Sequence, residues 1–264
     1  MIALCRDLAE EHAALDSMVA GLEEKVWDRL TPAAGWTIRD EITHLAYFDG
    51  TARLAATDAA AFAKHLEDLF RNAAHFEEDC LKAGRAMTSG ALLAQWRQER
   101  AILLGALERL DPRDRLPWYG PPMSTRSFAT ARLMETWAHG QDVADALRVD
   151  RPPSSRLRHV AHIGFTTFGW SFTNRGMEIP GVPVRVELTG PEGDLWTWGP
   201  EGAQDVVRGP AEDFCLVVTQ RRHVDDTDIV TVGDIARRWM LAAQAFAGPP
   251  GAGRASGSFR KRSR

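Results

Sequence analysis

Three residues of this sequence, His44, Glu135 and His139, are of the types that hold a divalent metal ion. Glu135 and His139 are four residues apart, about one turn of a helix, so both side chains would point from one helix face. His44 lies in a second stretch with helical periodicity, residues 37–45. Two histidines and one glutamate leave one position of a tetrahedral zinc ion open, as catalytic zinc sites do. The residues therefore predict a catalytic metal site between two neighbouring helices.

The sequence around these residues resembles a known family. An E-x-x-x-H pair by itself is more often a surface hydrogen bond than a metal site. Residues 35–45 read Gly-Trp-Thr-Ile-Arg-Asp-Glu-Ile-Thr-His-Leu and resemble the W-x-x-x-D-x-x-x-H-L signature of the DinB-like metalloproteins. Glu135-x-x-x-His139-x-x-Asp142 resembles the second half of that signature. The resemblance is closest to the mycothiol-dependent maleylpyruvate isomerase branch, which carries Glu where other DinB-like proteins carry His.

This resemblance implies a fold and a chemistry. The fold is a four-helix bundle that holds a divalent metal, usually zinc, and is followed by a smaller α+β domain. The thiol of a low-molecular-weight cofactor, here mycothiol, would take the open metal position. In this branch the second domain supplies an arginine that contacts an anionic substrate, and Arg222 or its neighbour Arg221 is the nearest by position. The alternative for this pair is a solvated basic surface.

Two carboxylates near the ligands are candidates for orienting them. Asp40 precedes His44 by one helical turn and could hydrogen-bond its imidazole. Asp40 is also the third helical residue after Thr37, close to a capping box, and this role alone would explain it. Asp142 follows His139 by three residues on the same face and could fix the tautomer of that histidine.

A proline-rich segment, residues 111–123, separates two of the predicted helices. It contains Trp118 and Tyr119, which we place in the substrate pocket as part of a lid. The alternative is a loop that these two aromatic side chains pin to the bundle.

Apolar periodicity and helix-breaking residues predict the other elements. We expect helices in the first part of the chain over residues 2–29, 37–56, 59–83, 88–110 and 127–147. Pro152-Pro153 ends the last of these and marks a domain boundary at about 150. A further helix is expected over 154–174, strands over 182–188, 195–198 and 205–208, and helices over 210–220 and 234–246.

The predicted fold class is thus α+β: an up-down four-helix bundle over residues 1–150, then a small mixed domain over 151–247. Residues 248–264 contain four glycines, two prolines and five basic residues without an acid, so we expect a disordered basic tail.

Composition limits the function classes. The chain has 264 residues, 44% hydrophobic and 26% charged, as in soluble globular proteins. The net charge of −4 does not indicate nucleic-acid binding, and no apolar run is long enough to span a membrane. Three widely spaced cysteines, Cys5, Cys80 and Cys215, favour a reducing cytoplasm over a disulfide framework. Only four of the 32 basic residues are lysines, which fits a GC-rich actinobacterial genome.

These observations predict a metal- and thiol-dependent isomerase or S-transferase. Zinc or another divalent metal would activate the thiol of mycothiol as a nucleophile toward a small electrophilic substrate. Two alternatives stay open: a non-catalytic metal-binding protein of stress response or sensing, and a small-molecule or lipid carrier whose pocket does not involve the metal.

Overall fold

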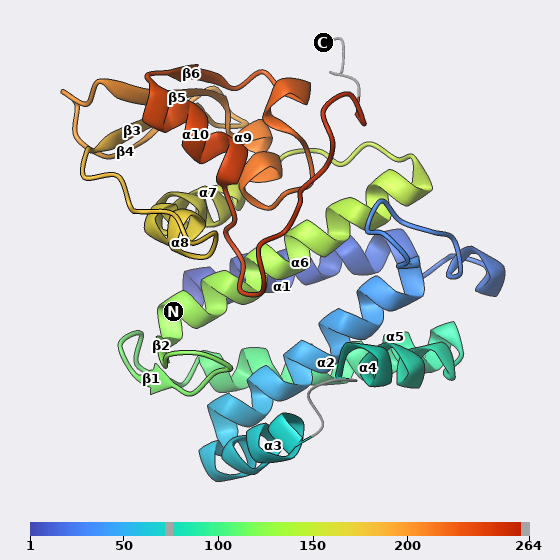
Figure 1. The fold of residues 1–264 in the computed structure, drawn as a ribbon. Coiled ribbons are helices and arrows are strands. Elements are labelled where there is room, and N and C mark those ends of the chain that lie inside the picture. The colour runs from blue at the N-terminus through green and yellow to red at the C-terminus, as the bar shows by residue number, and fades with distance from the viewer. Residues whose placement is uncertain (72–75, 260–264) are drawn as a thin grey trace. The chain divides into compact units, whose positions relative to one another are not determined.

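The computed structural model describes residues 1–71 and 76–259. The chain divides into two compact units, Met1–Arg151 and Pro152–Arg264. This division falls one residue from the boundary predicted at 150. The first unit is helical, and the second combines helices with a sheet (Figure 1).

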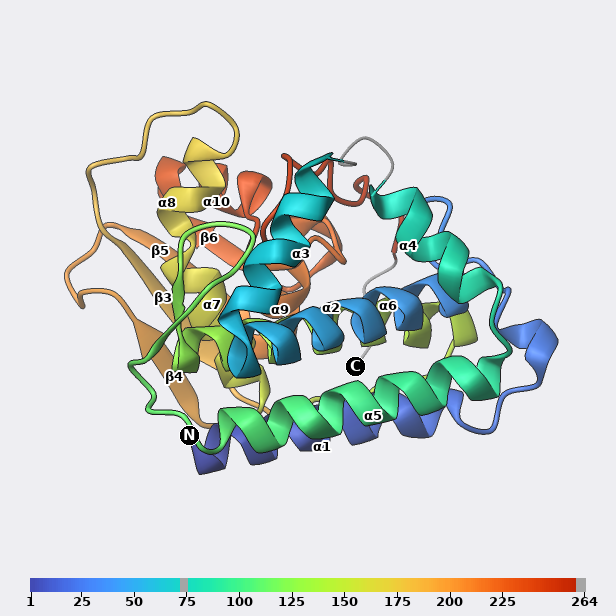
Figure 2. The ribbon, with the colours of Figure 1, turned by 90° about the horizontal axis from the view of Figure 1, so that it is seen from below.

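Long helices build the first unit and lie side by side in both ribbon views (Figures 1 and 2). They are α1 (Ile2–Val19), α2 (Ile38–Thr57), α5 (Ser89–Leu107) and α6 (Thr125–Leu147). Helix α2 packs against both α5 and α6, and α1 packs against α6. Helices α2 and α6, which carry the predicted metal ligands, are therefore direct neighbours.

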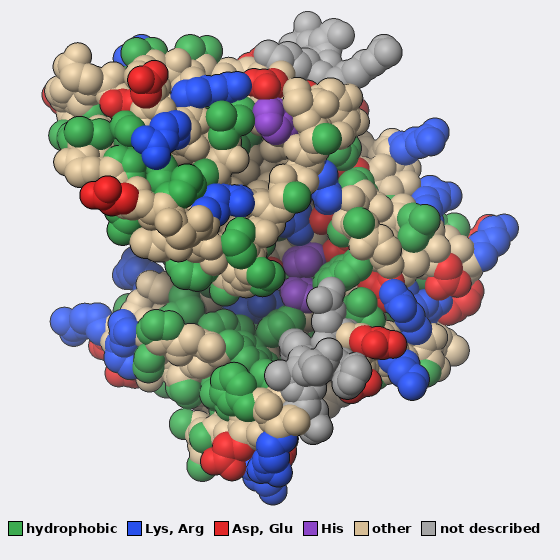
Figure 3. All heavy atoms as spheres, viewed as in Figure 1, with side chains coloured by type: hydrophobic (Ala, Val, Ile, Leu, Met, Phe, Trp, Pro, Cys, Tyr) green, Lys and Arg blue, Asp and Glu red, His purple; other side chains and the backbone are tan. Residues whose placement is uncertain are grey.

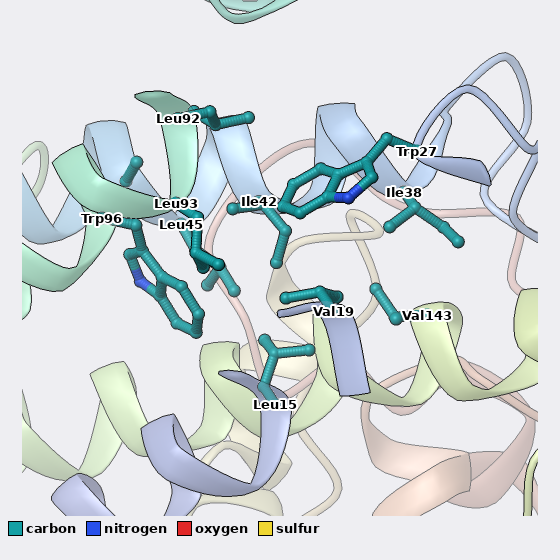
Figure 4. Packing of buried hydrophobic residues seen from close by; sticks show 11 residues of the cluster. Leu15, Val19, Trp27, Ile38, Ile42, Leu45, Leu92, Leu93, Trp96 and Val143 are labelled. Atoms are coloured by element: carbon teal, nitrogen blue, oxygen red, sulfur yellow. The ribbon is translucent and has the colours of Figure 1, made fainter. Parts of the chain in front are cut away.

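The start of α2 is fixed by the predicted capping box. The Thr37 side chain accepts from the backbone N–H of Asp40, and the Asp40 carboxylate accepts from the backbone N–H of Thr37. A hydrophobic cluster then holds α2 against its neighbours (Figure 4). Its largest members, Trp27 and Trp96, are 1% and 0% exposed. The cluster further contains Leu15, Val19, Ile38, Ile42, Leu45, Ala46, Leu92, Leu93 and Val143.

Three segments of the first unit differ from the expectation. The helix predicted over 59–83 is described as α3 (Ala59–Arg71) and α4 (Phe76–Arg85), which run in different directions in Figure 2, and residues 72–75 lie outside the described chain. The proline-rich segment contains a short antiparallel pair, β1 (Arg115–Leu116) and β2 (Met123–Ser124). A 3₁₀ turn, Glu24–Val26, follows α1, where the sequence pattern had extended the first helix to residue 29.

The second unit contains a sheet with strand order β4-β3-β5-β6. Strand β3 (Val184–Thr189) pairs antiparallel with β4 (Leu195–Trp198) and parallel with β5 (Asp205–Pro210). Strand β6 (Val230–Val232), which the sequence analysis did not predict, pairs antiparallel with β5. The helices are α7 (Leu157–Thr166), α8 (Phe168–Thr173), α9 (Ala211–Val218) and α10 (Asp234–Ala242), with a 3₁₀ turn at Val224–Asp226.

Much of the predicted disordered tail is held by hydrogen bonds within the second unit. The Gly251 N–H donates to Gln244, and the Gly251 carbonyl accepts from Arg175. The Phe259 ring lies 3.7 Å below the guanidinium of Arg222. Side chains of the second unit thus bond the backbone at Gly248, Pro249, Gly251, Gly257 and Phe259, which composition alone did not indicate. Residues 260–264 lie outside the described chain. Among the described residues, no helix combines the length and the apolar character needed to cross a membrane.

Candidate metal centre

The structure brings the three predicted ligands together from two helices. His44 projects from α2, and Glu135 and His139 project from α6, one turn apart. One nitrogen of each histidine and one carboxylate oxygen lie within 4.8 Å of one another. Glu135 Oε2 lies 3.2 Å from His139 Nε2 and 3.7 Å from His44 Nε2. The chemistry of this donor set fits zinc, which takes imidazole nitrogen and carboxylate oxygen as ligands.

Exposure differs among the three residues. The side chains of His44 and Glu135 are 21% and 22% exposed, whereas that of His139 is 11% exposed. Histidine side chains are visible at the molecular surface in Figure 3, beside hydrophobic ones. His44 and Glu135 thus keep about a fifth of their side-chain surface open to solvent.

Electrostatics keep these groups in the protonation states that bind metal. Burial lowers the pKa of His44 to about 4, and the neighbouring His139 imidazole acts in the same direction. For Glu135, burial acts to raise the pKa, but hydrogen bonds from His139 and His44 hold it well below its usual value. At neutral pH His44 is therefore a neutral imidazole and Glu135 a carboxylate, as coordination requires.

A fourth residue, Glu41, contacts the site and was missed by the sequence analysis. Its Oε2 lies 2.6 Å from His139 Nδ1, and its side chain is fully buried. Glu41, His139 and Asp142 also form a group of possible ligand atoms within 4.8 Å of one another. Glu41 precedes His44 by three residues and so shares its helix face. That spacing could have identified Glu41 as an orienting residue, but the sequence analysis considers Asp40 of the signature for this role instead.

Asp40 itself serves the helix start. Its carboxylate accepts from the Thr37 backbone and hydroxyl groups at 2.9 Å, and from Arg85 at 2.8 and 2.9 Å. Of the two roles considered for this residue, the structure shows these capping and ion-pair contacts. Asp142, the other predicted orienting carboxylate, is 1% exposed and lies beside His139 and Glu41.

Aromatic side chains line the site. The Trp36 ring stacks on His139, with 5.9 Å between ring centroids and 16° between planes, and lies 5.4 Å from His44. Trp36 is only half-buried, so it covers the two histidines rather than filling the bundle core. Phe48 contacts His44 from one turn further along α2, at 4.5 Å between centroids.

Trp118 and Tyr119 both contact Phe48, which in turn contacts His44. Phe48 lies 6.3 Å from the Trp118 ring and 5.6 Å from the Tyr119 ring. Trp118 stacks on Phe62 of α3 at 5.9 Å, and the Tyr119 hydroxyl lies 3.0 Å from His65 Nε2. Both aromatic residues are half-buried and attach the loop to α2 and α3. Their place in a substrate pocket stays a prediction.

A buried ion pair joins α2 and α6 beside the ligands. Arg132 Nε donates to Asp49 Oδ1 at 2.9 Å, and the Trp96 indole donates to Asp49 Oδ2 at 2.9 Å. Arg132 is 3% exposed and Asp49 is fully buried. His12 of α1 lies 3.6 Å from the same carboxylate. Side chains from α1, α2, α5 and α6 thus meet at Asp49.

Arg222 lies in the second unit, beyond the end of α9. Its guanidinium donates to the Arg221 carbonyl at 2.7 Å and lies over the Phe259 ring. The arginine is half-buried. A contact with substrate stays a prediction for this residue.

Comparison with known proteins supplies independent findings. The sequence family described as mycothiol maleylpyruvate isomerase N-terminal domain matches residues 8–144, a range that includes all three candidate ligands. The family described as wyosine base formation matches residues 180–232. Two proteins of Mycobacterium tuberculosis, from strains CDC 1551 / Oshkosh and ATCC 25618 / H37Rv, are each 48% identical over 248 residues. Each match covers 94% of this chain and 96% of the relative, and both relatives are named only as uncharacterized proteins.

Solved structures share the fold. The crystal structure of a mycothiol-dependent maleylpyruvate isomerase matches with a TM-score of 0.56 and 15% sequence identity, as does that of a histidine-to-alanine mutant of it. Each match covers 87% of this chain and 91% of the other. At this identity the likeness establishes the fold: a helical N-terminal region followed by a small mixed unit.

Proposed function

This chain belongs to the mycothiol maleylpyruvate isomerase N-terminal domain family, and we propose that it is a metal- and thiol-dependent isomerase or S-transferase. The metal is zinc or another divalent ion, the thiol is mycothiol, and the substrate is a small electrophile. The convergence of His44, Glu135 and His139 within 4.8 Å carries this proposal.

The donor set supports catalysis rather than a purely structural metal. Three protein ligands leave one of four tetrahedral positions free, and two of the three side chains retain about a fifth of their exposure. A divalent metal held there lowers the pKa of a thiol that binds it and so provides a nucleophile at neutral pH.

The protein's own residues supply binding and orientation. Glu135 is held ionised by the two histidines that flank it, so the site carries a negative charge for a cation. Trp36 and Phe48 present apolar ring faces beside His139 and His44, which exclude water from that side. The electrophile would lie against these rings. In an isomerase it would accept the thiolate at an activated double bond, rotate about the resulting single bond and release the thiol again.

Cobalt substitution tests this proposal. Co²⁺ in the site should give a visible spectrum, and added mycothiol should produce a sulfur-to-cobalt charge-transfer band. The band should be absent in His44→Ala and Glu135→Ala, because two remaining ligands hold the metal poorly. His65→Ala is the matched control: His65 bonds Tyr47 and Tyr119 and lies outside the ligand group, so its variant should keep the band.

Arg222→Ala should also keep the band, because a contact with an anionic substrate acts after the thiol has bound. If cobalt binds but no low-molecular-weight thiol changes its spectrum, thiol transfer is excluded and the protein is a non-catalytic metal binder. If His44→Ala binds cobalt as tightly as the wild type, His44 is not a ligand and the proposed metal site is contradicted.

A further inference from the structure

We infer that Glu41 is a positioning residue of the metal centre: it fixes the His139 imidazole with Nε2 directed at the metal. This inference rests on the proposed function for its consequence, although its structural part can be tested without any metal. It assigns a role to a residue that lies outside both the sequence signature and the set of three candidate ligands.

The contact between Glu41 and His139 is short and buried. Oε2 of Glu41 lies 2.6 Å from Nδ1 of His139, which is short even for a charge-assisted hydrogen bond. A carboxylate can only accept, so the proton of the bond belongs to Nδ1. With the proton kept on Nδ1, Nε2 is the only ring nitrogen that can give a lone pair to a metal. This nitrogen is the one that lies 3.2 Å from Glu135.

The second oxygen of Glu41 is also engaged. Glu41 Oε1 accepts from the Thr31 hydroxyl at 2.8 Å. The Thr31 backbone N–H donates to the Trp36 carbonyl at 2.8 Å, and the Trp36 ring stacks on His139. Glu41 thus holds His139 at Nδ1 and, through Thr31, anchors the loop whose tryptophan covers the face of the same imidazole. The ring cannot rotate without breaking one of these contacts.

The chemical consequence concerns metal affinity. A carboxylate on the outer nitrogen raises the basicity of the ligating nitrogen and fixes the orientation of the ring before a metal binds. Removing such an outer partner typically weakens metal binding by about 10–100-fold. Glu41 should therefore affect zinc affinity without being a ligand.

The neighbouring residue provides a matched control. Asp40 and Glu41 are adjacent in the first turn of α2, and both are 0% exposed. Asp40 bonds Thr37 and Arg85, whereas Glu41 bonds His139 and Thr31. Asp40→Asn and Glu41→Gln both replace a buried carboxylate by an amide at the same helix start. A purely structural effect should weaken zinc binding in both variants, whereas the loss of a positioning contact should weaken it only in Glu41→Gln.

Two measurements test the inference. Zinc competition titrations should give a dissociation constant raised about 10-fold or more in Glu41→Gln and Glu41→Leu, and changed less than about 3-fold in Asp40→Asn. Nitrogen-15 NMR of histidine-labelled, metal-free protein should show His139 protonated at Nδ1, with its signal identified by its loss in His139→Asn. In Glu41→Leu that signal should shift toward the Nε2-protonated form. Glu41→Gln keeps an acceptor and should retain folding if Glu41→Leu does not.

The outcomes separate the inference from the proposed function. A His139 without a proton on Nδ1 in the metal-free wild type overturns the inference, irrespective of the zinc affinity. Equal zinc affinities in wild type and Glu41→Gln overturn it as well. Two zinc ions per chain would make Glu41 a ligand of a second metal with Asp142 and His139, which also contradicts a positioning role. If the wild type binds no zinc while His139 is protonated at Nδ1, the proposed function fails and the orienting contact stands.

Discussion

At the scale of single residues, the site combines one tightly held candidate ligand with two more exposed ones. His139 is contacted at Nδ1 by Glu41, near Nε2 by Glu135 and on its face by Trp36. His44 has aromatic neighbours and keeps 21% of its side-chain exposure. The open coordination position proposed for the thiol is thus expected on the side of His44.

Another histidine, His12, gives the chain a pH-dependent stability. Burial lowers the pKa of His12 to about 4, below the value of about 6.5 that an unfolded chain has. The unfolded chain therefore binds a proton more readily, and the stability present above pH 6.5 is lost as the pH falls toward 4. Between pH 7 and pH 5 this histidine should cost about 2 kcal/mol of unfolding free energy.

Urea unfolding of the metal-free protein at pH 7 and pH 5 measures this loss. His12→Leu should show a smaller difference between the two pH values than wild type. The remaining difference should include His44, whose pKa is lowered in the same direction. If the free energy of unfolding falls by the same amount between pH 7 and pH 5 in wild type and in His12→Leu, His12 does not titrate as proposed.

At the scale of elements, α2 and α6 are the pair on which the site depends. They carry the candidate ligands, and the Asp49–Arg132 ion pair joins the two helices five residues after His44 and three before Glu135. Trp96 of α5 donates to the same Asp49. The register of the two helices is therefore fixed close to the ligands by a buried polar contact.

Breaking this ion pair should be strongly destabilising. Asp49→Asn leaves the buried Arg132 charge without its carboxylate, at a cost of about 3–5 kcal/mol in unfolding free energy. Replacing both partners by apolar residues, Asp49→Leu with Arg132→Met, should cost much less, because no charge is then left unpaired. Urea unfolding of the single and double variants at pH 7 decides between these outcomes. A double variant as unstable as Asp49→Asn would show that the unpaired Arg132 charge is not what destabilises the single variant.

Local patterns predicted the elements better than the contacts between them. The capping residues Thr37 and Asp40 gave the start of α2, and the Glu135–His139 spacing gave a shared face on α6. The pairing of Glu41 with His139 joins residues 98 positions apart, so no local pattern contains it. Arg85 likewise meets Asp40 across 45 positions, a contact that no local pattern contains.

The second unit was harder to predict for a similar reason. Strand β6 has three residues, and its Val230 and Val232 are 57% and 44% exposed, so it lacks the buried alternation that marks a strand. Its position depends on pairing with β5. Residues 248–259 read as disordered by composition, yet Gln244 and Arg175 bond their backbone.

At the scale of the whole molecule, the first unit has a core that does not depend on a metal. The cluster around Trp27, Trp96 and Ile42 is fully buried, and the candidate ligands lie outside it. A core of this kind is sufficient for a helical unit of about 150 residues to fold. Metal binding should therefore add stability without creating the fold.

Chelation tests this separation. Removing the metal should lower the melting temperature by several degrees, because a ligand that binds only the folded state stabilises it by mass action. Helical circular dichroism and a single cooperative transition should persist. His44→Ala should melt at the same temperature with and without chelator. A metal-free protein without helical signal at room temperature would show that the metal is structural.

X-ray absorption at the zinc edge tests the central claim most directly. The zinc-loaded protein alone should show only nitrogen and oxygen neighbours at about 2.0–2.2 Å, two of them imidazoles. After addition of mycothiol, one sulfur neighbour should appear at about 2.3 Å while both imidazoles remain. A spectrum that mycothiol leaves unchanged, or a zinc with fewer than two imidazoles, would contradict an open thiol-accepting site at His44, Glu135 and His139.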